Sequence, residues 1–270
     1  MENALALIRA RRSVRSFAPG PLAPGLPARL EDFARDVPNP FGIPVRFYLL
    51  TAKEHGLKSP VVSGAEWYAA ASVPRCPHAE EAFGYSFQHF LLYAQSLGLG
   101  GVWLGGTMDR PAFEKAIALR EEEMMPCVSP LGVPAAKMSL VESLMRKGVK
   151  ADSRAPFGSL FFEGDFSRPL TPAAAGPLSA PLEAVRLGPS AVNKQPWRVV
   201  IAPGAAHFYL RHAPGFGGGA AGDMQKVDLG IALCHFALAA REQGLALAFS
   251  TELPALSAPE HTEYIATWRF

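Results

Sequence analysis

Two segments of the chain carry the same pattern of apolar and polar positions, 146 residues apart. Residues 84–103 and 230–249 each place a wide apolar stripe at helical spacing ahead of a Gly-Leu pair and an apolar run. Aligned without gaps, they share these pairs: Gly84/Gly230, His89/His235, Phe90/Phe236, Leu92/Leu238, Ala94/Ala240, Gly98/Gly244 and Leu99/Leu245. Each segment is predicted to form a long helix, a turn and a strand, so the chain contains a repeat.

A second pair of segments extends the repeat. Residues 43–50 (IPVRFYLL) resemble 195–202 (QPWRVVIA), with Pro44/Pro196 and Arg46/Arg198 in register. A repeat this long indicates a duplicated domain, because solenoid units run to only tens of residues. We interpret the chain as a dimer fused into one polypeptide, an arrangement in which ligands often bind across the two-fold interface.

The other periodic stretches predict further elements in both halves. Predicted helices cover 2–12, 27–36, 79–97, 109–119, 178–187 and 224–243. Predicted strands cover 45–51, 101–104, 125–131, 197–202, 206–212, 245–251 and 263–269, with a short strand or helix near 61–71. Alternating helices and antiparallel strands indicate an α+β fold. We expect a first unit over 1–134, a wrapping connector over 135–177 and a second unit over 178–270.

Composition narrows the class of protein. Hydrophobic residues make up 49% and charged residues 19% of the 270 residues, which fits a compact chain. A net charge of +2 gives no reason to expect nucleic acid or an anionic membrane as partner. The three cysteines (Cys76, Cys127, Cys234) are far apart and are interpreted as free thiols. With no bilayer-length apolar run and no signal-peptide pattern, we expect a cytoplasmic protein.

The repeat breaks down where polar residues gather. Residues 189–197 read PSAVNKQPW, whereas the matching stretch 37–45 reads VPNPFGIPV and keeps only the proline at 44. Ser190 falls against Pro38, and Asn193 falls against Phe41. Conversely, RRSVRSF at the start of the first half has no counterpart ahead of the second. This complementary loss predicts one surviving site between the halves rather than two.

Taken together, RRSVRSF, PSAVNKQPW, the helix end SLGLGGVWLGG and the strand MPCVSPLGVP resemble the ordered landmarks of the nitroreductase-like FMN oxidoreductases. Ordinary members of that family are homodimers with two flavins bound at the interface. In them the PSAVN-type landmark follows the RRS-type landmark within one unit, and its displacement here is similar to the fused tandem branch. The resemblance covers nearly the whole chain and implies a nitroreductase-like α+β pseudo-dimer.

The resemblance implies a basic set of residues around FMN. Arg11 and Ser13 match positions that hold the phosphate and ribityl chain, where the planar fork of a guanidinium suits phosphate oxygens. Arg12 between them belongs to the same predicted site. Arg15 matches a cation near the pyrimidine end of the flavin, which stabilises the anionic reduced ring. Arg154 resembles the late basic residue that completes the phosphate site.

Two further segments are implied to lie around the flavin ring. A loop of the second half would reach the isoalloxazine from the opposite unit, through Pro189, Ser190 and Asn193. A segment of the first half would place its backbone against the ring near N5, at Leu104, Gly105 and Gly106. Glycines permit such a close approach.

The function implied by the resemblance is an FMN-dependent oxidoreductase. NADH or NADPH would reduce the flavin and leave, and a small acceptor such as a nitroaromatic or quinone would replace it in a ping-pong cycle. We expect no catalytic side chain and no metal, since the flavin carries the chemistry. We expect a monomer, because the ancestral interface is internal. Two alternatives remain open: a flavin-binding or flavin-storing protein with little turnover, and a flavin-free scaffold.

Other interpretations of the same residues compete with the functional one. The arginines of the first fifteen residues could form a solvated helix face, and Asn193 could make only turn hydrogen bonds. We expect Trp197 in the core and His89 and His235 in packing roles. The glycines of a G-x-G-x-x-G pattern (Gly217, Gly219, Gly222) lie too far from the preceding strand and from Glu252 for dinucleotide binding. We expect a glycine loop at the rim of the active site.

Overall fold

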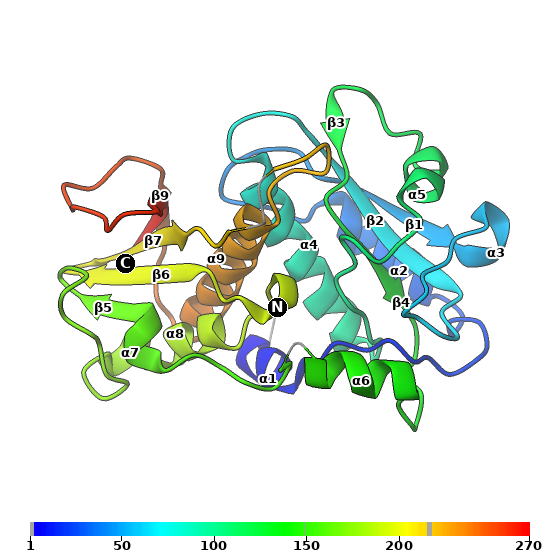
Figure 1. The fold of residues 1–270 in the computed structure, drawn as a ribbon, viewed down its shortest axis with the longest axis horizontal. Helices are drawn as coiled ribbons and strands as arrows, with labels where there is room; N and C mark the ends of the chain where they lie inside the picture. Colours follow the sequence, from blue (N-terminus) through cyan, green and yellow to red (C-terminus); the bar gives the residue numbers. More distant parts are fainter. Residues whose placement is uncertain (1–2, 149, 215–217) are drawn as a thin grey trace.

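Two sheets lie on either side of a central pair of long helices in the computed structural model (Figure 1), which describes residues 3–148, 150–214 and 218–270. The central helices are α4 (Ala79–Ser96) and α9 (Met224–Glu242). Buried side chains of α4 pack with the first sheet, and those of α9 pack with the second. This is the α+β pseudo-dimer that the repeat predicts.

The first sheet is built around β2. Strand β2 (Trp67–Pro74) pairs antiparallel with β1 (Arg46–Thr51) on one side. On its other side it pairs antiparallel with β3 (Glu123–Met124) and β4 (Val128–Leu131). Residues 100–104 add isolated bridges to this edge, between Gly100 and Gly132 and between Leu104 and Val128.

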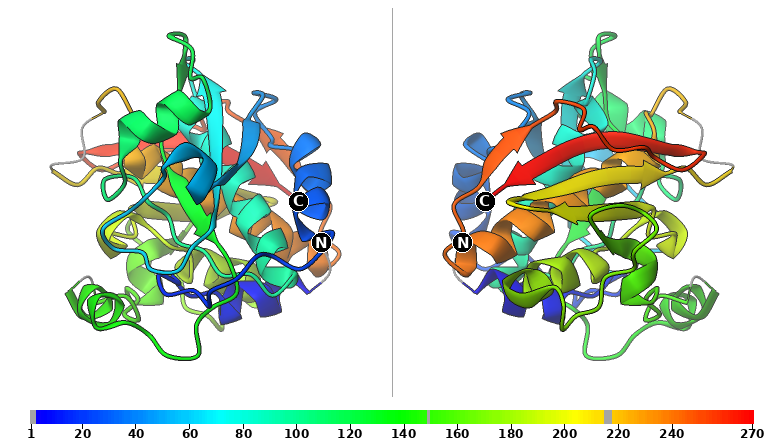
Figure 2. Two further views of the ribbon diagram at one scale, coloured as in Figure 1. Left: turned by 90° about the vertical axis from the view of Figure 1, so that its right-hand side faces the viewer. Right: turned by 90° about the vertical axis from the view of Figure 1, so that its left-hand side faces the viewer.

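The second sheet has the order β5-β6-β7-β9-β8 (Figure 2, right view). Its strands are β5 (Phe161–Glu163), β6 (Trp197–Ala202), β7 (Ala205–Arg211), β8 (Ala248–Ser250) and β9 (Thr262–Arg269). Neighbours are antiparallel except β5, which runs parallel to β6. The order of neighbouring strands β6-β7-β9-β8 corresponds to the order β1-β2-β4 in the first sheet, where residues 100–104 take the place of β8.

Shorter helices cover the sheets and join the halves. They are α1 (Ala4–Ala10), α2 (Leu26–Arg35), α3 (Ala52–His55), α5 (Arg110–Ala116), α6 (Leu140–Gly148), α7 (Phe157–Leu160), α8 (Ser179–Arg186) and the 3-10 turns η1 (Gly176–Leu178) and η2 (Ala191–Asn193). Among the described helices, none has the length and apolar character needed to cross a bilayer. All three cysteines are free.

The central helices touch backbone to backbone at two glycines. A Cβ atom on Gly84 would overlap the carbonyl oxygen of Val227, and one on Gly230 would overlap that of Glu81. Gly84 and Gly230 are a repeat pair, and Glu81 and Val227 have the same spacing. The contact is therefore self-complementary, as across a two-fold dimer axis.

Most predicted elements are present, with four main differences. The predicted strand 125–131 keeps only Val128–Leu131. Strand 101–104 is reduced to isolated bridges, and strand 245–251 shortens to Ala248–Ser250. The connector does more than wrap, because it contains α6 and α7 and supplies β5 to the second sheet. Phe161 of β5 is fully buried. A strand of three residues is too short to show a periodic pattern in the sequence. Its pairing with β6 joins residues that are distant in sequence, so neighbouring residues do not reveal it.

The helix crossing predicts a stability effect at its glycines. Replacing Gly84 or Gly230 with alanine forces the helices apart, and we expect a loss of about 1–3 kcal/mol of unfolding free energy in urea denaturation. Gly148 is the matched control, because it ends a helix with nothing within 4 Å of an added Cβ. Gly148→Ala should be neutral or slightly stabilising. Equal effects at all three positions would contradict the account.

Candidate functional site

Four arginines from two separate segments of the first 154 residues form a cationic cluster. Arg11 directly follows α1, and its N–H donates to the Leu7 carbonyl. Burial, followed by the charges of Arg154 and Arg146, lowers the pKa of Arg11 to about 10. Burial also lowers the pKa of Arg15 and of Arg154, each with a further contribution from Arg146. Like charges therefore gather at partly buried positions, where burial and the charge of Arg146 disfavour the charged forms of Arg11, Arg15 and Arg154.

The cluster has unused hydrogen-bond donors. The Nε atoms of Arg11, Arg15 and Arg154 are buried and have no hydrogen-bond partner among the described residues. Unpartnered buried donors on like-charged groups are costly, and an anion with several acceptor oxygens would relieve both costs. The donor set therefore fits a phosphate group.

The loop 189–193 of the second half is held in a strained conformation. Val192 and Asn193 have φ of 43° and 58°, in the left-handed region that a β-branched residue avoids. The Asp228 carboxyl group on α9 accepts from the Ala191 N–H, with its two oxygens 3.0 and 3.1 Å from the nitrogen. The Ser190 hydroxyl accepts from the Gln195 N–H at 2.9 Å. These hydrogen bonds hold the loop in its strained conformation. Strained backbone of this kind is often found at functional sites.

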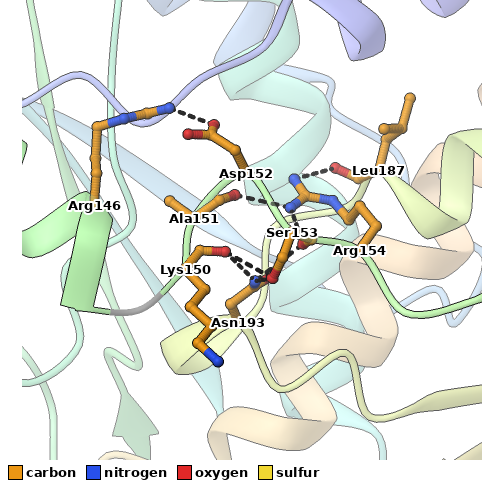
Figure 3. Close-up of polar contacts among 8 residues, drawn as sticks. All are labelled: Arg146, Lys150, Ala151, Asp152, Ser153, Arg154, Leu187 and Asn193. Atoms are coloured by element: carbon orange, nitrogen blue, oxygen red, sulfur yellow. Dashed lines mark hydrogen bonds and ion pairs between the residues drawn. The ribbon is translucent and has the colours of Figure 1, made fainter.

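The same loop reaches the segment that carries Arg154 (Figure 3). The Asn193 side-chain amide donates to the carbonyls of Lys150 at 2.8 Å and Ser153 at 3.1 Å. The Arg154 guanidinium donates to the carbonyls of Ala151 and Ser153, at 2.8 and 2.7 Å. The structure thus brings the second-half loop next to the segment of the basic cluster that carries Arg154. The Ser190 and Asn193 side chains form hydrogen bonds with the protein backbone.

The glycine segment of the first half is fixed by one arginine. Leu104 is buried and pairs with Val128. The Arg110 guanidinium donates to the carbonyls of Gly105 at 3.0 Å, Met125 at 2.5 Å and Pro126 at 3.0 Å. An added Cβ on Gly106 would meet nothing within 4 Å. The backbone at Gly106 is therefore open to a ligand, while the turn before it is held in place.

Helix α9 holds both flanking segments from a single turn. A Cβ atom on Gly105 would lie 3.4 Å from the Met224 sulfur, and Asp228, four residues further along α9, binds the loop at Ala191. Residues four apart share one face of a helix. The glycine segment of one half and the loop of the other are therefore assembled against the same face of α9.

The pseudo-symmetric position on the other side of the molecule is filled by aromatic rings. Phe41, which replaces Asn193 in the repeat, stacks on His78 with ring centroids 5.2 Å apart. It also meets Phe249 edge to face at 4.8 Å. His78 and Phe249 occupy the repeat positions of Met224 and Trp103. The second ancestral position thus holds packed aromatic side chains where the first has a polar loop, which supports a single site.

The remaining predicted residues lie at the edge of the site or in the core. Arg12 is exposed at the rim of a cavity of about 170 Å³, which Arg11 and Gln88 also line. Trp197 is fully buried, as expected. His235 accepts from the Gln88 amide and donates to the Ala184 carbonyl, and burial lowers its pKa to about 3, so it is neutral. Pro189 is the first residue of the strained loop.

The glycine-rich stretch does not form a nucleotide fingerprint in the part that is described. Gly219 and Gly222 bridge each other in a tight turn just before α9. Gly217 lies outside the described residues. Glu252, the acidic residue of the pattern, is exposed after β8.

Three residues of the site were missed from sequence: Arg110, Arg146 and Asp228. Asp228 carried a usable signal, because it is a carboxylate within an otherwise apolar stretch of α9 and its repeat partner is Ala82. Arg146 stood within a basic stretch that has no repeat counterpart. Arg110 follows a turn, and only its three carbonyl contacts reveal its role.

Comparison with known proteins identifies relatives over the whole chain. A family model described as "Putative TM nitroreductase" matches residues 3–240. A "putative nitroreductase" from Thermotoga maritima MSB8 has 19% identity and a TM-score of 0.62, covering 99% of this chain and 93% of that one. This likeness shows the same fold across both halves. No curated protein matches the chain significantly.

Two shorter solved structures are also similar to part of the chain. A "Putative NADH dehydrogenase/NAD(P)H nitroreductase" from Bacteroides thetaiotaomicron has 21% identity and a TM-score of 0.43, covering 52% of this chain and 90% of that one. A "putative nitroreductase in complex with fmn" from Desulfovibrio desulfuricans has 22% identity and a TM-score of 0.40, covering 53% and 95%.

The buried Asp228 predicts a pH effect on stability. Burial raises its pKa well above the usual range, although its hydrogen bond to Ala191 acts in the opposite direction. Above about pH 4 the unfolded chain loses a proton that the folded chain keeps, so the free energy of unfolding falls as pH rises. Asp228→Asn cannot ionise and still offers Ala191 an acceptor. We expect the variant to lose this decline, which amounts to about 1.4 kcal/mol per pH unit while only the folded chain keeps the proton.

Urea denaturation of both proteins between about pH 4 and pH 8 measures this difference. Asp36→Asn, at an exposed position, is the control for loss of one carboxylate and should follow the unaltered protein. A decline as steep in Asp228→Asn as in the unaltered protein would show that Asp228 is ionised in the folded chain.

Proposed function

The chain belongs to the nitroreductase family whose model it matches, and from that premise we propose that it is an FMN-dependent oxidoreductase. NADH or NADPH would supply the electrons, and a small acceptor such as a nitroaromatic or quinone would receive them by a ping-pong mechanism. The observation that carries the proposal is the arginine cluster with buried, unpartnered Nε atoms beside the facing segments of both halves. Such a composite site fits a phosphate-bearing ligand between the units.

Each group of the site has a defined task under this proposal. Arg11 and Arg154 would bind the phosphate, and Arg15 would stabilise negative charge at the pyrimidine end of the ring. The backbone at Gly105 and Gly106 would lie against the ring, held there by Arg110. The loop at Asn193 would cover the opposite side. Bound FMN supplies the redox chemistry, and the protein supplies orientation, charge and exclusion of water.

We propose that the protein acts as a monomer in the cytoplasm. The contact between α4 and α9 already buries the interface that separate subunits would use. The free cysteines support a reducing compartment.

Turnover tests the enzymatic part of the proposal. With FMN added, the protein should oxidise NADH or NADPH in the presence of a nitroaromatic or quinone, followed by absorbance at the nicotinamide band. Arg11→Ala removes a phosphate partner, and we expect it to weaken FMN binding by on the order of 1.5–3 kcal/mol in a fluorescence titration. The exposed Arg35→Ala is the charge-matched control.

Two results would contradict the proposal in different ways. Full FMN loading without oxidation of either nicotinamide, with any acceptor of these classes, would leave a flavin-binding or flavin-storing protein. Absence of FMN uptake would leave a flavin-free scaffold. Unchanged FMN affinity in Arg11→Ala would place the phosphate elsewhere.

A further inference from the structure

Helix α6 joins the two basic segments of the site. At its start, the Ser139 N–H donates to the hydroxyl of Ser16 at 3.0 Å. Ser16 directly follows Arg15 in the sequence. At its end, the Ala151 N–H donates to the Arg146 carbonyl at 2.9 Å. The carbonyl of Ala151 in turn accepts from Arg154. The helix is therefore anchored at both ends to residues next to cluster arginines.

One face of α6 is directed at the cluster. Glu142 and Arg146 lie four residues apart on that face. Glu142 is buried, and its charge partly offsets the effect of burial on the pKa of Arg15. The Arg146 side chain is only 17% exposed. Its charge is the last of the causes that act on the pKa of Arg11, Arg15 and Arg154, after burial and other charges. Arg146 is thus the member whose charge reaches the other three.

The counter-ion of Arg146 is much more exposed than Arg146 itself. The Asp152 carboxylate lies 2.5 Å from Arg146 Nη2 (Figure 3). The Asp152 side chain is 83% exposed and follows the turn that ends α6. An ion pair with a solvent-exposed partner is weak, and this carboxylate can move into water without breaking a packed contact. A phosphate has more acceptor oxygens and more charge than the carboxylate it would replace.

We propose that Arg146 is a fourth arginine ligand of the flavin phosphate, and that Asp152 is a resident counter-ion which the phosphate displaces. This inference rests on the proposed function. The connector would then contain two residues with opposite effects: Arg146 would increase the affinity for phosphate, and Asp152 would compete with phosphate for Arg146. Phosphate binding would then release the Asp152 side chain from Arg146, while the backbone of the turn 150–153 stays bonded to α6 and to Asn193.

The test compares FMN with riboflavin, which has the same ring and no phosphate. Arg146→Gln should weaken FMN binding by about tenfold to a hundredfold and leave riboflavin binding unchanged. Asp152→Asn should strengthen FMN binding severalfold, again with no change for riboflavin. Lys147→Gln is the matched control on the same helix, because Lys147 is exposed and its substitution also removes one positive charge. It should bind both flavins as the unaltered protein does.

The outcomes separate this inference from the proposed function. If the unaltered protein binds no FMN, the proposed function fails and the inference fails with it. If it binds FMN and Arg146→Gln binds equally well, only the inference is overturned. Equal losses for FMN and riboflavin in Arg146→Gln would show a structural role and overturn it too. Weaker FMN binding by Asp152→Asn would show that Asp152 supports the site rather than competing with phosphate.

Discussion

The close crossing of α4 and α9 at Gly84 and Gly230 determines where the parts of the candidate site lie. Because the helix backbones touch, the first turns of α9 come within reach of both the glycine segment of the first half and the loop of the second. Met224 contacts the former, and Asp228 binds the latter. A side chain at the crossing would separate these segments, which are distant in sequence and belong to different sheets.

The two halves share a fold but have diverged in chemistry. One interface position has arginines with unused donors, a strained polar loop and an open glycine. The pseudo-symmetric position has Phe41 packed between His78 and Phe249. Buried like charges and strain destabilise the first position in the absence of a ligand, whereas aromatic packing stabilises the second. A fused chain permits this asymmetry because its two halves can change in sequence separately, whereas the two subunits of a homodimer have the same sequence.

The sequence predicted the parts whose signal is periodic or repeated. The long helices, most strands of the second sheet and the glycine pair follow from the spacing of apolar residues and from the repeat. The central strand of the first sheet, β2, was predicted only as a short strand or helix near 61–71. Strand β5 and helix α6 were missed, since the first has three residues and the second lies in a stretch without a repeat partner. The resemblance pointed to the loop 189–193 and to Arg11, Arg15 and Arg154. It did not point to Arg146 or to the bonds of Ser190 and Asn193, which depend on tertiary contacts.

The central claim is that the chain keeps one composite flavin site, built from both halves. The most direct measurement is the amount of FMN released by denaturation per chain, read from visible absorbance after saturation with FMN and removal of the excess. One FMN per chain is the result that the account predicts. Two per chain would show that the position filled by Phe41 also binds flavin, and none would remove the flavin site altogether.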